Sequence, residues 1–498
     1  MTLAVLLTAS GDAGAQPARK KNTAVTPAPA ETGGKPEPVP AETVPPFTRF
    51  YEPVILNGKT LPGFMGKSIR SFRVGVAAGD GVSLKPIPFQ VDERNERNGA
   101  FVYSLGPGAD FRDETPGIFD ENDEIVFLAR DAGSRLSAGA RENLGAGVIE
   151  ATLIDQRNGS RMWAYLFPHS DMLPLSDIKR VKLDDPDEGL RVTAEGYGFR
   201  LARDCQLTFD YLAVRDGAIP EVNIMDRLKV RGWVKLFGLI SIKTNECDWT
   251  SRYHAAVDGP VRVIRRTKNS YTITVVPTVR FDTELVFYPH HFEVAITGRL
   301  PFDLRRVAPS GGFGVYVDYN DAVKGAQFYT GAYTEGVTFD GTPKTEPTPE
   351  VLGRVPYVWS ALYGVGPGRN LGWFSRVVPG FNVPTKYAPQ INDDDRAANP
   401  PESYPGVHEI GFKVDSLDEM QGGRFAISSV LYRTKDWSPA DVQSLLDVVD
   451  KPLLVELSPA DGVSVPVTRF TLSTRPNEPP LPAEADGTDG TPAGKGSK

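Results

Sequence analysis

Residues 279–297 read VRFDTELVFYPHHFEVAIT, and this stretch decides the fold class. It contains two runs, 279–288 and 292–297, in which β-branched and aromatic residues recur with a period of two. Such a period places alternate side chains on opposite faces of a β-strand. Similar runs lie further out, at 71–76, 148–154, 162–167 and 271–276, separated by Gly, Pro, Asn and Asp. The sequence therefore predicts an all-β fold, mainly an antiparallel β-sandwich or super-sandwich.

The clearest helix signal lies at residues 439–450. Ser438 is placed to cap the helix N-terminus, a proline follows at the first helical position, and Asp441 puts an acid in the first turn. Apolar residues then recur at helical spacing, at Val442, Leu445, Leu446 and Val449. We expect one or two short helices in the chain, with this one packed on a sheet face.

The two ends of the chain lack apolar periodicity. Residues 1–15 resemble a signal peptide, with an apolar run at 3–7 and the small-x-small pattern Ala13-Gly-Ala15, although an uncleaved N-terminus is the alternative. Residues 16–46 form a Pro-rich linker and residues 474–498 a similar tail, and both are expected to be disordered. These features predict an exported protein, either periplasmic or extracellular.

A charged, turn-rich segment near 171–190 marks a boundary within the folded part. It separates an N-terminal β domain, 47–185, from a larger β-sandwich domain, 190–473, which includes the predicted helix. The 498 residues carry a formal net charge of −8, so the chain as a whole has no basic field for nucleic acid or an anionic membrane. No window reaches ~18 consecutive apolar residues, and no transmembrane span is therefore expected.

Cys205 and Cys247 are the only cysteines. In an exported chain two cysteines most simply form a disulfide. Two buried free thiols are the alternative.

Acidic residues gather at two neighbouring points of the N-terminal domain. Asp92 follows one strand, and Asp120, Asn122 and Asp123 precede the buried strand 125–128. Calcium takes 6–8 oxygen ligands and prefers carboxylates and carbonyls, so these four side chains are candidate calcium ligands. The alternative is a solvated turn whose side chains cap the local backbone. No other cofactor is indicated.

Two short patterns resemble a known family. Gln90 and Asp92, followed by the acidic strand entry at 123–127, resemble the opening module of secreted sugar-processing proteins with a galactose-mutarotase-like super-sandwich. The segment 258–265, DGPVRVIR, is similar to a strand entry in the super-sandwich domains of polysaccharide lyases, where a strand such as 284–288 follows. The resemblance covers about 70 residues and implies a role connected with carbohydrate.

An enzyme of that kind requires a base and a cation near the sugar. His or Tyr commonly removes the proton, and Arg neutralises a sugar carboxylate. The candidate catalytic residues are Tyr253, His254, Arg262 and His290. The alternative is that these residues make local hydrogen bonds at strand ends.

Aromatic residues recur among glycines in the later part of the chain. Trp359, Tyr363 and Trp373 are candidate ligand-binding residues, because flat rings stack on the apolar face of a sugar. The alternative is that these rings lie in the core of a sheet.

The preferred function is non-catalytic binding of a glycan or of an envelope or extracellular protein. A polysaccharide lyase or sugar epimerase is the first alternative, and a structural role in assembly of the cell envelope is the second. The chain contains no H-E-x-x-H, no G-x-S-x-G and no G-x-G-x-x-G following a strand, so zincin, serine-hydrolase and dinucleotide-binding functions are not supported.

Overall fold

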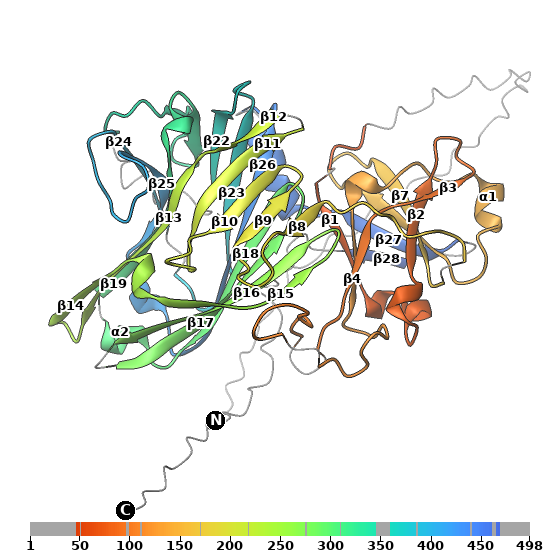
Figure 1. The fold of residues 1–498 in the computed structure, drawn as a ribbon, viewed down its shortest axis with the longest axis horizontal. Helices are drawn as coiled ribbons and strands as arrows, with labels where there is room; N and C mark the ends of the chain where they lie inside the picture. The colour runs from red at the N-terminus through yellow and green to blue at the C-terminus, as the bar shows by residue number, and fades with distance from the viewer. Residues whose placement is uncertain are drawn as a thin grey trace, which may run out of the picture. The chain divides into compact units, whose positions relative to one another are not determined.

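The computed structural model describes twelve stretches of the chain: residues 46–49, 51–95, 99–109, 112–169, 171–217, 219–273, 276–308, 310–344, 359–384, 387–438, 441–460 and 465–468. All belong to a single unit, Pro45–Lys498. The predicted signal-like segment, the tail and all of the linker except Pro46 lie outside these residues. Strands dominate the described part and assemble into five sheets, which confirms the all-β prediction (Figure 1).

A nine-stranded sheet is the largest element of the fold. In spatial order its strands are β15 Thr250–Asp258, β16 Val263–Ile273, β17 Val276–Phe287, β18 His291–Leu300, β26 Gly423–Lys435, β23 Leu371–Pro379, β22 Trp359–Val365, β20 Gln327–Thr330 and β21 Val337–Thr338. The stretch that predicted the fold forms β17 and β18, which pair antiparallel from Arg280–Arg299 to Phe287–Phe292.

Two five-stranded sheets pack against the nine-stranded sheet. The first contains β12 Ile219–Asn223, β11 Phe209–Asp216, β10 Tyr197–Leu201, β9 Arg191–Ala194 and β8 Val181–Leu183. The second contains β14 Ile240–Thr244, β13 Met225–Leu236, β19 Ser310–Tyr319, β25 Val407–Val414 and β24 Ala388–Asp394. All three sheets contribute to one core, in which the ring of Phe199 lies 4.8 Å from that of Phe287 and 5.2 Å from that of Phe292. The arrangement is therefore a layered sandwich.

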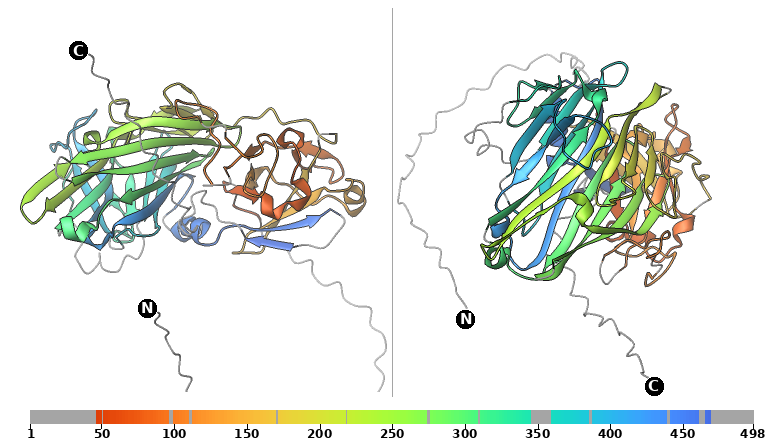
Figure 2. Two further views of the ribbon diagram at one scale, coloured as in Figure 1. Left: turned by 90° about the horizontal axis from the view of Figure 1, so that it is seen from below. Right: turned by 60° about the vertical axis from the view of Figure 1, so that its left-hand side comes forward.

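The N-terminal part of the chain forms two smaller sheets. One contains β1 Pro53–Asn57, β5 Glu124–Leu128 and β4 Phe89–Asp92. The other contains β28 Val465–Thr468, β27 Leu454–Pro459, β6 Ile149–Ile154, β7 Arg161–Phe167, β2 Arg73–Ala77 and β3 Leu84–Pro86. Figure 2 shows β27 and β28, in blue, beside the orange N-terminal strands, and Val455 of β27 pairs with Leu153 of β6. The chain thus returns to its first sheets at its C-terminal end, while the boundary near 185–190 stays a prediction.

Three α-helices occur among the described residues: α1 Ala138–Glu142, α2 Leu304–Val307 and α4 Val442–Asp450. Helix α4 corresponds to the predicted helix 439–450, and residues 439–440 lie outside the described part. Ser438 donates hydrogen bonds from its N–H and hydroxyl groups to the carboxylate of Asp441, and Asp441 directly precedes α4, so the cap at Ser438 stays a prediction. The apolar side of α4 packs near Trp359 and Trp437, as expected for a helix on a sheet. No helix of the described part is long and apolar enough to cross a membrane.

Candidate functional site

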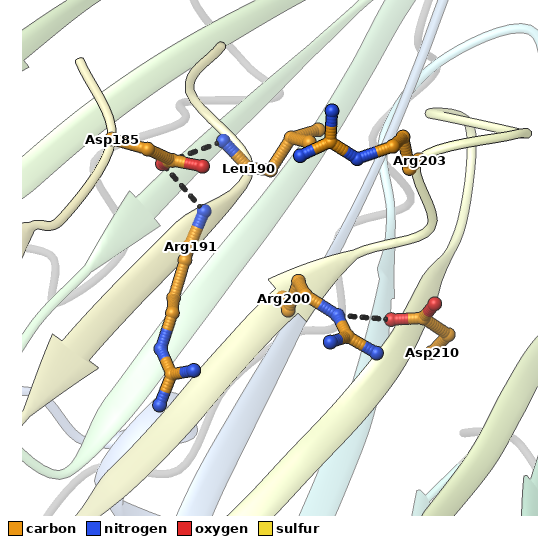
Figure 3. Close-up of a pocket in the computed structure, with 6 residues that line it drawn as sticks. All are labelled: Asp185, Leu190, Arg191, Arg200, Arg203 and Asp210. Atoms are coloured by element: carbon orange, nitrogen blue, oxygen red, sulfur yellow. Dashed lines mark hydrogen bonds and ion pairs between the residues drawn. The ribbon is translucent and has the colours of Figure 1, made fainter.

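A polar pocket of about 410 Å³ lies on the first five-stranded sheet. Its volume falls within the ~300–1,000 Å³ of typical ligand pockets. The lining residues are Asp185, Leu190, Arg191, Arg200, Arg203 and Asp210 (Figure 3). Three arginines and two aspartates therefore line this pocket.

Strand alternation puts these charges on the outer face of the sheet. In β9, Val192 enters the sandwich core while Arg191 is exposed, and in β10, Phe199 enters the core while Arg200 is exposed. Arg191 and Arg200 are paired across the two strands, so their side chains lie side by side on one face. The same period of two that builds the core thus builds the pocket.

Each guanidinium group of the pocket has a carboxylate partner. Arg200 donates to Asp210 at 2.9 Å, Arg203 lies 2.6 Å from Glu188, and Arg191 lies 3.4 Å from Glu221. The carboxylate of Asp185 accepts the backbone N–H groups of Leu190 and Arg191 at 2.9 and 2.8 Å, which fixes the turn before β9. Positive charge is therefore balanced locally.

Tyr211 adds an aromatic ring to the same face. The guanidinium carbons of Arg191 and Arg200 lie 5.5 and 5.6 Å from its ring centroid. Its hydroxyl donates to Glu221 at 2.5 Å, and burial together with that carboxylate raises the pKa of Tyr211 to about 12. A side chain at Gly198 would come within 3.2 Å of the ring, so glycine keeps the face open beside it.

This combination of groups suits a ligand rich in hydroxyls. A hydroxyl group both donates and accepts hydrogen bonds, whereas a guanidinium only donates and a carboxylate only accepts. Donors and acceptors on one face can both be used by the hydroxyl groups of such a ligand, and an aromatic ring offers an apolar surface beside them. Sequence reasoning missed this site, although alternating residues in 191–200 give a signal for its outward-facing arginines.

The structure gives the four predicted catalytic residues different surroundings. Tyr253 is buried, donates to the carbonyl of Pro186 and lies beneath the guanidinium of Arg265. The backbone of His254 accepts a hydrogen bond from Gly108. The contacts of Tyr253, and those of Arg262 and His290 below, place these three side chains in separate clusters, and a catalytic role for the four residues stays a prediction.

Arg262 is fully buried in an ionic network between β4, β5 and β16. Its guanidinium lies 2.7 Å from the carboxylate of Asp92 and 2.6 Å from that of Glu124, and it donates to the hydroxyl of Tyr288 at 3.2 Å. Gln90 accepts the Arg262 backbone N–H at 3.0 Å and donates to Asp92 at 2.6 Å. The two sequence patterns that resembled sugar-processing proteins, the one with Gln90 and Asp92 and the one at 258–265, therefore meet in this network.

His290 lies in a separate, partly exposed cluster. Arg130 contacts its Nε2 atom at 2.7 Å, and the ring of Tyr51 lies 4.3 Å from its own ring. Burial, with the positive charges of Arg130, Arg433 and Arg180, lowers the pKa of His290 to about 3. The ring is therefore neutral at physiological pH.

Three of the four predicted calcium ligands, Asp92, Asp120 and Asp123, have protein partners, whereas the buried Oδ1 atom of Asn122 has no hydrogen-bond partner among the described residues. Asp92 is paired with Arg262. Asp123 accepts the backbone N–H groups of Arg94 at 2.9 Å and Asp120 at 3.0 Å, and Asp120 accepts that of Asn122 at 3.1 Å. Burial raises the pKa of Asp123 to about 7. These are the contacts of a capped turn, and calcium at this point stays a prediction.

The three candidate ligand-binding aromatic residues do not form one surface. Trp373 is buried in the core between the sheets, opposite Leu362 of the neighbouring strand. Trp359 and Tyr363 project from the other face of the nine-stranded sheet and pack near helix α4. The period of two along β22 and β23 separates them.

The predicted disulfide between Cys205 and Cys247 is wrong for this structure, in which both residues are free thiols. Cys205 is buried and Cys247 is exposed. Burial first, and then the adjacent thiol of Cys247, raise the pKa of Cys205. The two side chains are neighbours without a bond between them.

One group of described residues has ligand atoms close enough for a metal ion: Asp321, Asp395 and His408, within 4.8 Å of one another. Asp393 holds the Nδ1 atom of His408 at 2.7 Å, and its hydrogen bond raises the pKa of that ring. The ammonium group of Lys324 contacts the carboxylates of Asp321 and Asp395 at 3.0 Å each. The chain thus supplies its own cation to these carboxylates.

Comparison with known proteins gives only distant similarities. No family model matches the chain, and no curated protein matches it. Among solved structures, it is similar to the α-N-acetylgalactosaminidase of Bifidobacterium bifidum in complex with GalNAc, with 11% identity over 53% of this chain and 39% of that one, at a TM-score of 0.35. It is also similar to a putative aldose 1-epimerase of Klebsiella pneumoniae, with 12% identity over 53% of this chain and 78% of that one, at a TM-score of 0.30.

A third similar structure is an α-mannosidase of Enterococcus faecalis, with 8% identity over 82% of this chain and 45% of that one, at a TM-score of 0.40. The chain spans about two fifths of the length of the bifidobacterial enzyme. The TM-scores of these structures lie between 0.30 and 0.40, and the resemblance to super-sandwich proteins stays a prediction. The function of the chain rests on its own residues.

Proposed function

We propose that the chain binds a neutral saccharide at the pocket on the first five-stranded sheet, as an exported binding protein. The observation that carries this proposal is the set of charged residues that line the pocket, together with the ring of Tyr211, which lies next to two of its arginines, Arg191 and Arg200. Such a face offers paired donors and acceptors to hydroxyl groups and an apolar surface to a sugar ring.

The charge balance favours a neutral saccharide over an acidic one. Arg191, Arg200 and Arg203 each lie against a carboxylate, so an incoming uronate would have to displace a negative charge already present. Bidentate contacts between arginine and carboxylate are stronger than those between neutral groups. A hydroxyl group can instead join such a pair without breaking it.

The test is a titration of the full chain with a panel of neutral and acidic oligosaccharides, measured by calorimetry. We expect neutral members to bind, and we expect Arg200→Ala to weaken that binding about tenfold, which corresponds to ~1.4 kcal/mol. The matched control is Arg396→Ala, because Arg396 is exposed and paired with one carboxylate, Asp394, outside the pocket.

Two results would contradict the proposal. The first is that no neutral oligosaccharide of the panel gives a heat of binding. The second is that Arg200→Ala and Arg396→Ala lower the affinity equally. A protein captured by the chain when no saccharide binds would favour the assembly role instead.

One observation favours an epimerase or lyase as a second candidate. Asp393 holds His408 through Nδ1 at 2.7 Å, while Nε2 lies 3.3 Å from the exposed Asp321, an arrangement suited to proton transfer. Interconversion of galactose or glucose anomers can be followed by NMR, and eliminative cleavage of a polysaccharide by ultraviolet absorbance. Acceleration that is lost in Asp393→Asn would support this candidate, and rates equal to the uncatalysed ones would exclude it.

A further inference from the structure

The hairpin formed by β13 and β14 ends in an exposed apolar tip. Phe237, Leu239 and Ile240 are 54%, 84% and 48% exposed. Leu236 pairs with Ile240 across the base of the turn, so all three exposed side chains lie at or next to its tip. Apolar side chains gathered at one exposed point, rather than scattered singly, mark an interaction site.

The backbone of the tip shows a second unusual feature. Phe237 has a φ of 50°, followed by Gly238 at 72°. The left-handed region suits Gly or Asn, and a bulky aromatic residue there is uncommon. The tip therefore presents a large apolar ring at a position where a small polar residue would be more favourable. This choice of residue favours a role for the ring in binding.

Basic side chains flank this tip. Lys235 and Lys243 are exposed on the two strands of the hairpin, and helix α2 lies against the turn because the Phe237 N–H donates to the carbonyl of Val307. Arg305 of α2 is exposed as well. Among the described residues, no ion pair joins Lys235, Lys243 or Arg305 to a carboxylate, whereas Arg306 is paired with Asp303 at 3.2 Å.

We propose that this hairpin tip docks on a membrane surface containing anionic lipid. An apolar tip enters the boundary between head groups and acyl chains, and flanking Lys and Arg contact anionic head groups. The chain as a whole carries −8, so the uncompensated positive charge around the tip also orients the molecule toward such a surface. The saccharide pocket lies on a different sheet, and the two proposals are independent.

Vesicle co-sedimentation of the full chain tests this proposal. We expect binding to vesicles of phosphatidylcholine and phosphatidylglycerol, weaker binding to phosphatidylcholine alone, and loss with rising salt. Leu239→Asp should lower the bound fraction at least fivefold, and the double variant Lys235→Gln/Lys243→Gln at least twofold. Val82→Asp is the matched control, because Val82 is also an exposed apolar residue, at 61%, but lies in a turn distant in sequence from the hairpin. This variant should leave vesicle binding unchanged.

The tip lies outside the core, so the variants should retain the wild-type circular dichroism and melting temperature. Equal sedimentation of wild type and Leu239→Asp would overturn the proposal. So would a wild-type dimer in light scattering that becomes a monomer in Leu239→Asp, because a second copy would then be the partner of the tip.

Discussion

Arg262 carries a full positive charge at a position without solvent exposure. Removing one partner of a buried ionic network leaves the other charges unpaired, at a typical cost of about 3–5 kcal/mol. We therefore expect Arg262→Met to lower the free energy of unfolding by that amount, since Asp92 and Glu124 both lose their cation. Urea denaturation provides the measurement.

The control for this variant is Arg266→Met in β16, the strand that begins directly after Arg262. Arg266 is paired with Asp282, and both side chains are 28% exposed, so the pair should contribute only about 0–1 kcal/mol. Equal losses of unfolding free energy in the two variants would show that the buried network around Arg262 contributes no more than the partly exposed pair.

His290 provides a test by pH. Its pKa is about 3 in the folded chain because of burial and three neighbouring arginines, against about 6.5 in an unfolded chain. Between these values the unfolded state binds a proton that the folded state does not, so stability falls as pH decreases from about 6.5 toward about 3. We expect His290→Gln to remove part of that fall.

The measurement is the difference in unfolding free energy between pH 7 and pH 4, compared for wild type and His290→Gln. Asn143→Gln, at an exposed residue that does not titrate, serves as control and should leave the difference unchanged. A difference as large in His290→Gln as in wild type would mean that His290 is accessible to protons in the folded chain.

The two thiols give a third test at the scale of the residue. Cys247 is exposed, and Cys205 is buried with a raised pKa, so a thiol reagent should modify one cysteine per native chain and two in denaturant. No modification in either condition would demonstrate a disulfide.

The partners of individual residues were the feature least predictable from the sequence. Asp92 and Arg262 were both selected from the sequence, for calcium binding and for catalysis, and the structure pairs them with each other. Their separation of 170 residues hides this pairing in a single sequence. The selected residue types were informative, whereas their partners depend on how distant strands come together.

At the scale of elements, alternation was a dependable guide. The runs around 279–297 became β17 and β18 in the predicted form. The return of the chain to its first sheets had no sequence signal, because β27 is a short strand that resembles many others. Cross-strand partners, unlike strand periodicity, are set by tertiary packing.

Strand β27 yields a prediction at this scale. Val455 is 1% exposed in the core of the N-terminal sheets, next to residues from the start of the chain. Val455→Ala should lower the free energy of unfolding by about 2 kcal/mol, from lost burial and the cavity left behind. Glu456→Ala, on the partly exposed side of the same strand, should cost less than about 0.5 kcal/mol.

Comparing these two variants by urea denaturation shows whether the C-terminal strand belongs to the N-terminal core. A negligible effect of Val455→Ala would contradict that assignment.

At the scale of the whole molecule, three sheets build a sandwich whose outer faces are available for binding. The pocket proposed to bind a saccharide lies on the first five-stranded sheet and the apolar hairpin tip on the second, while the nine-stranded sheet carries helix α4. The same alternation that predicted the core also produced the polar outer face. Periodicity therefore predicted which side chains face the core, whereas the assignment of strands to sheets, and with it the position of the pocket, depends on tertiary packing.

The most direct test of saccharide binding is hydrogen–deuterium exchange of the full chain with and without a neutral oligosaccharide. We expect slower exchange in the backbone of β10 and β11, residues 197–216, which carry Arg200 and Tyr211. Protection confined to other sheets, with unchanged exchange over 197–216, would contradict it.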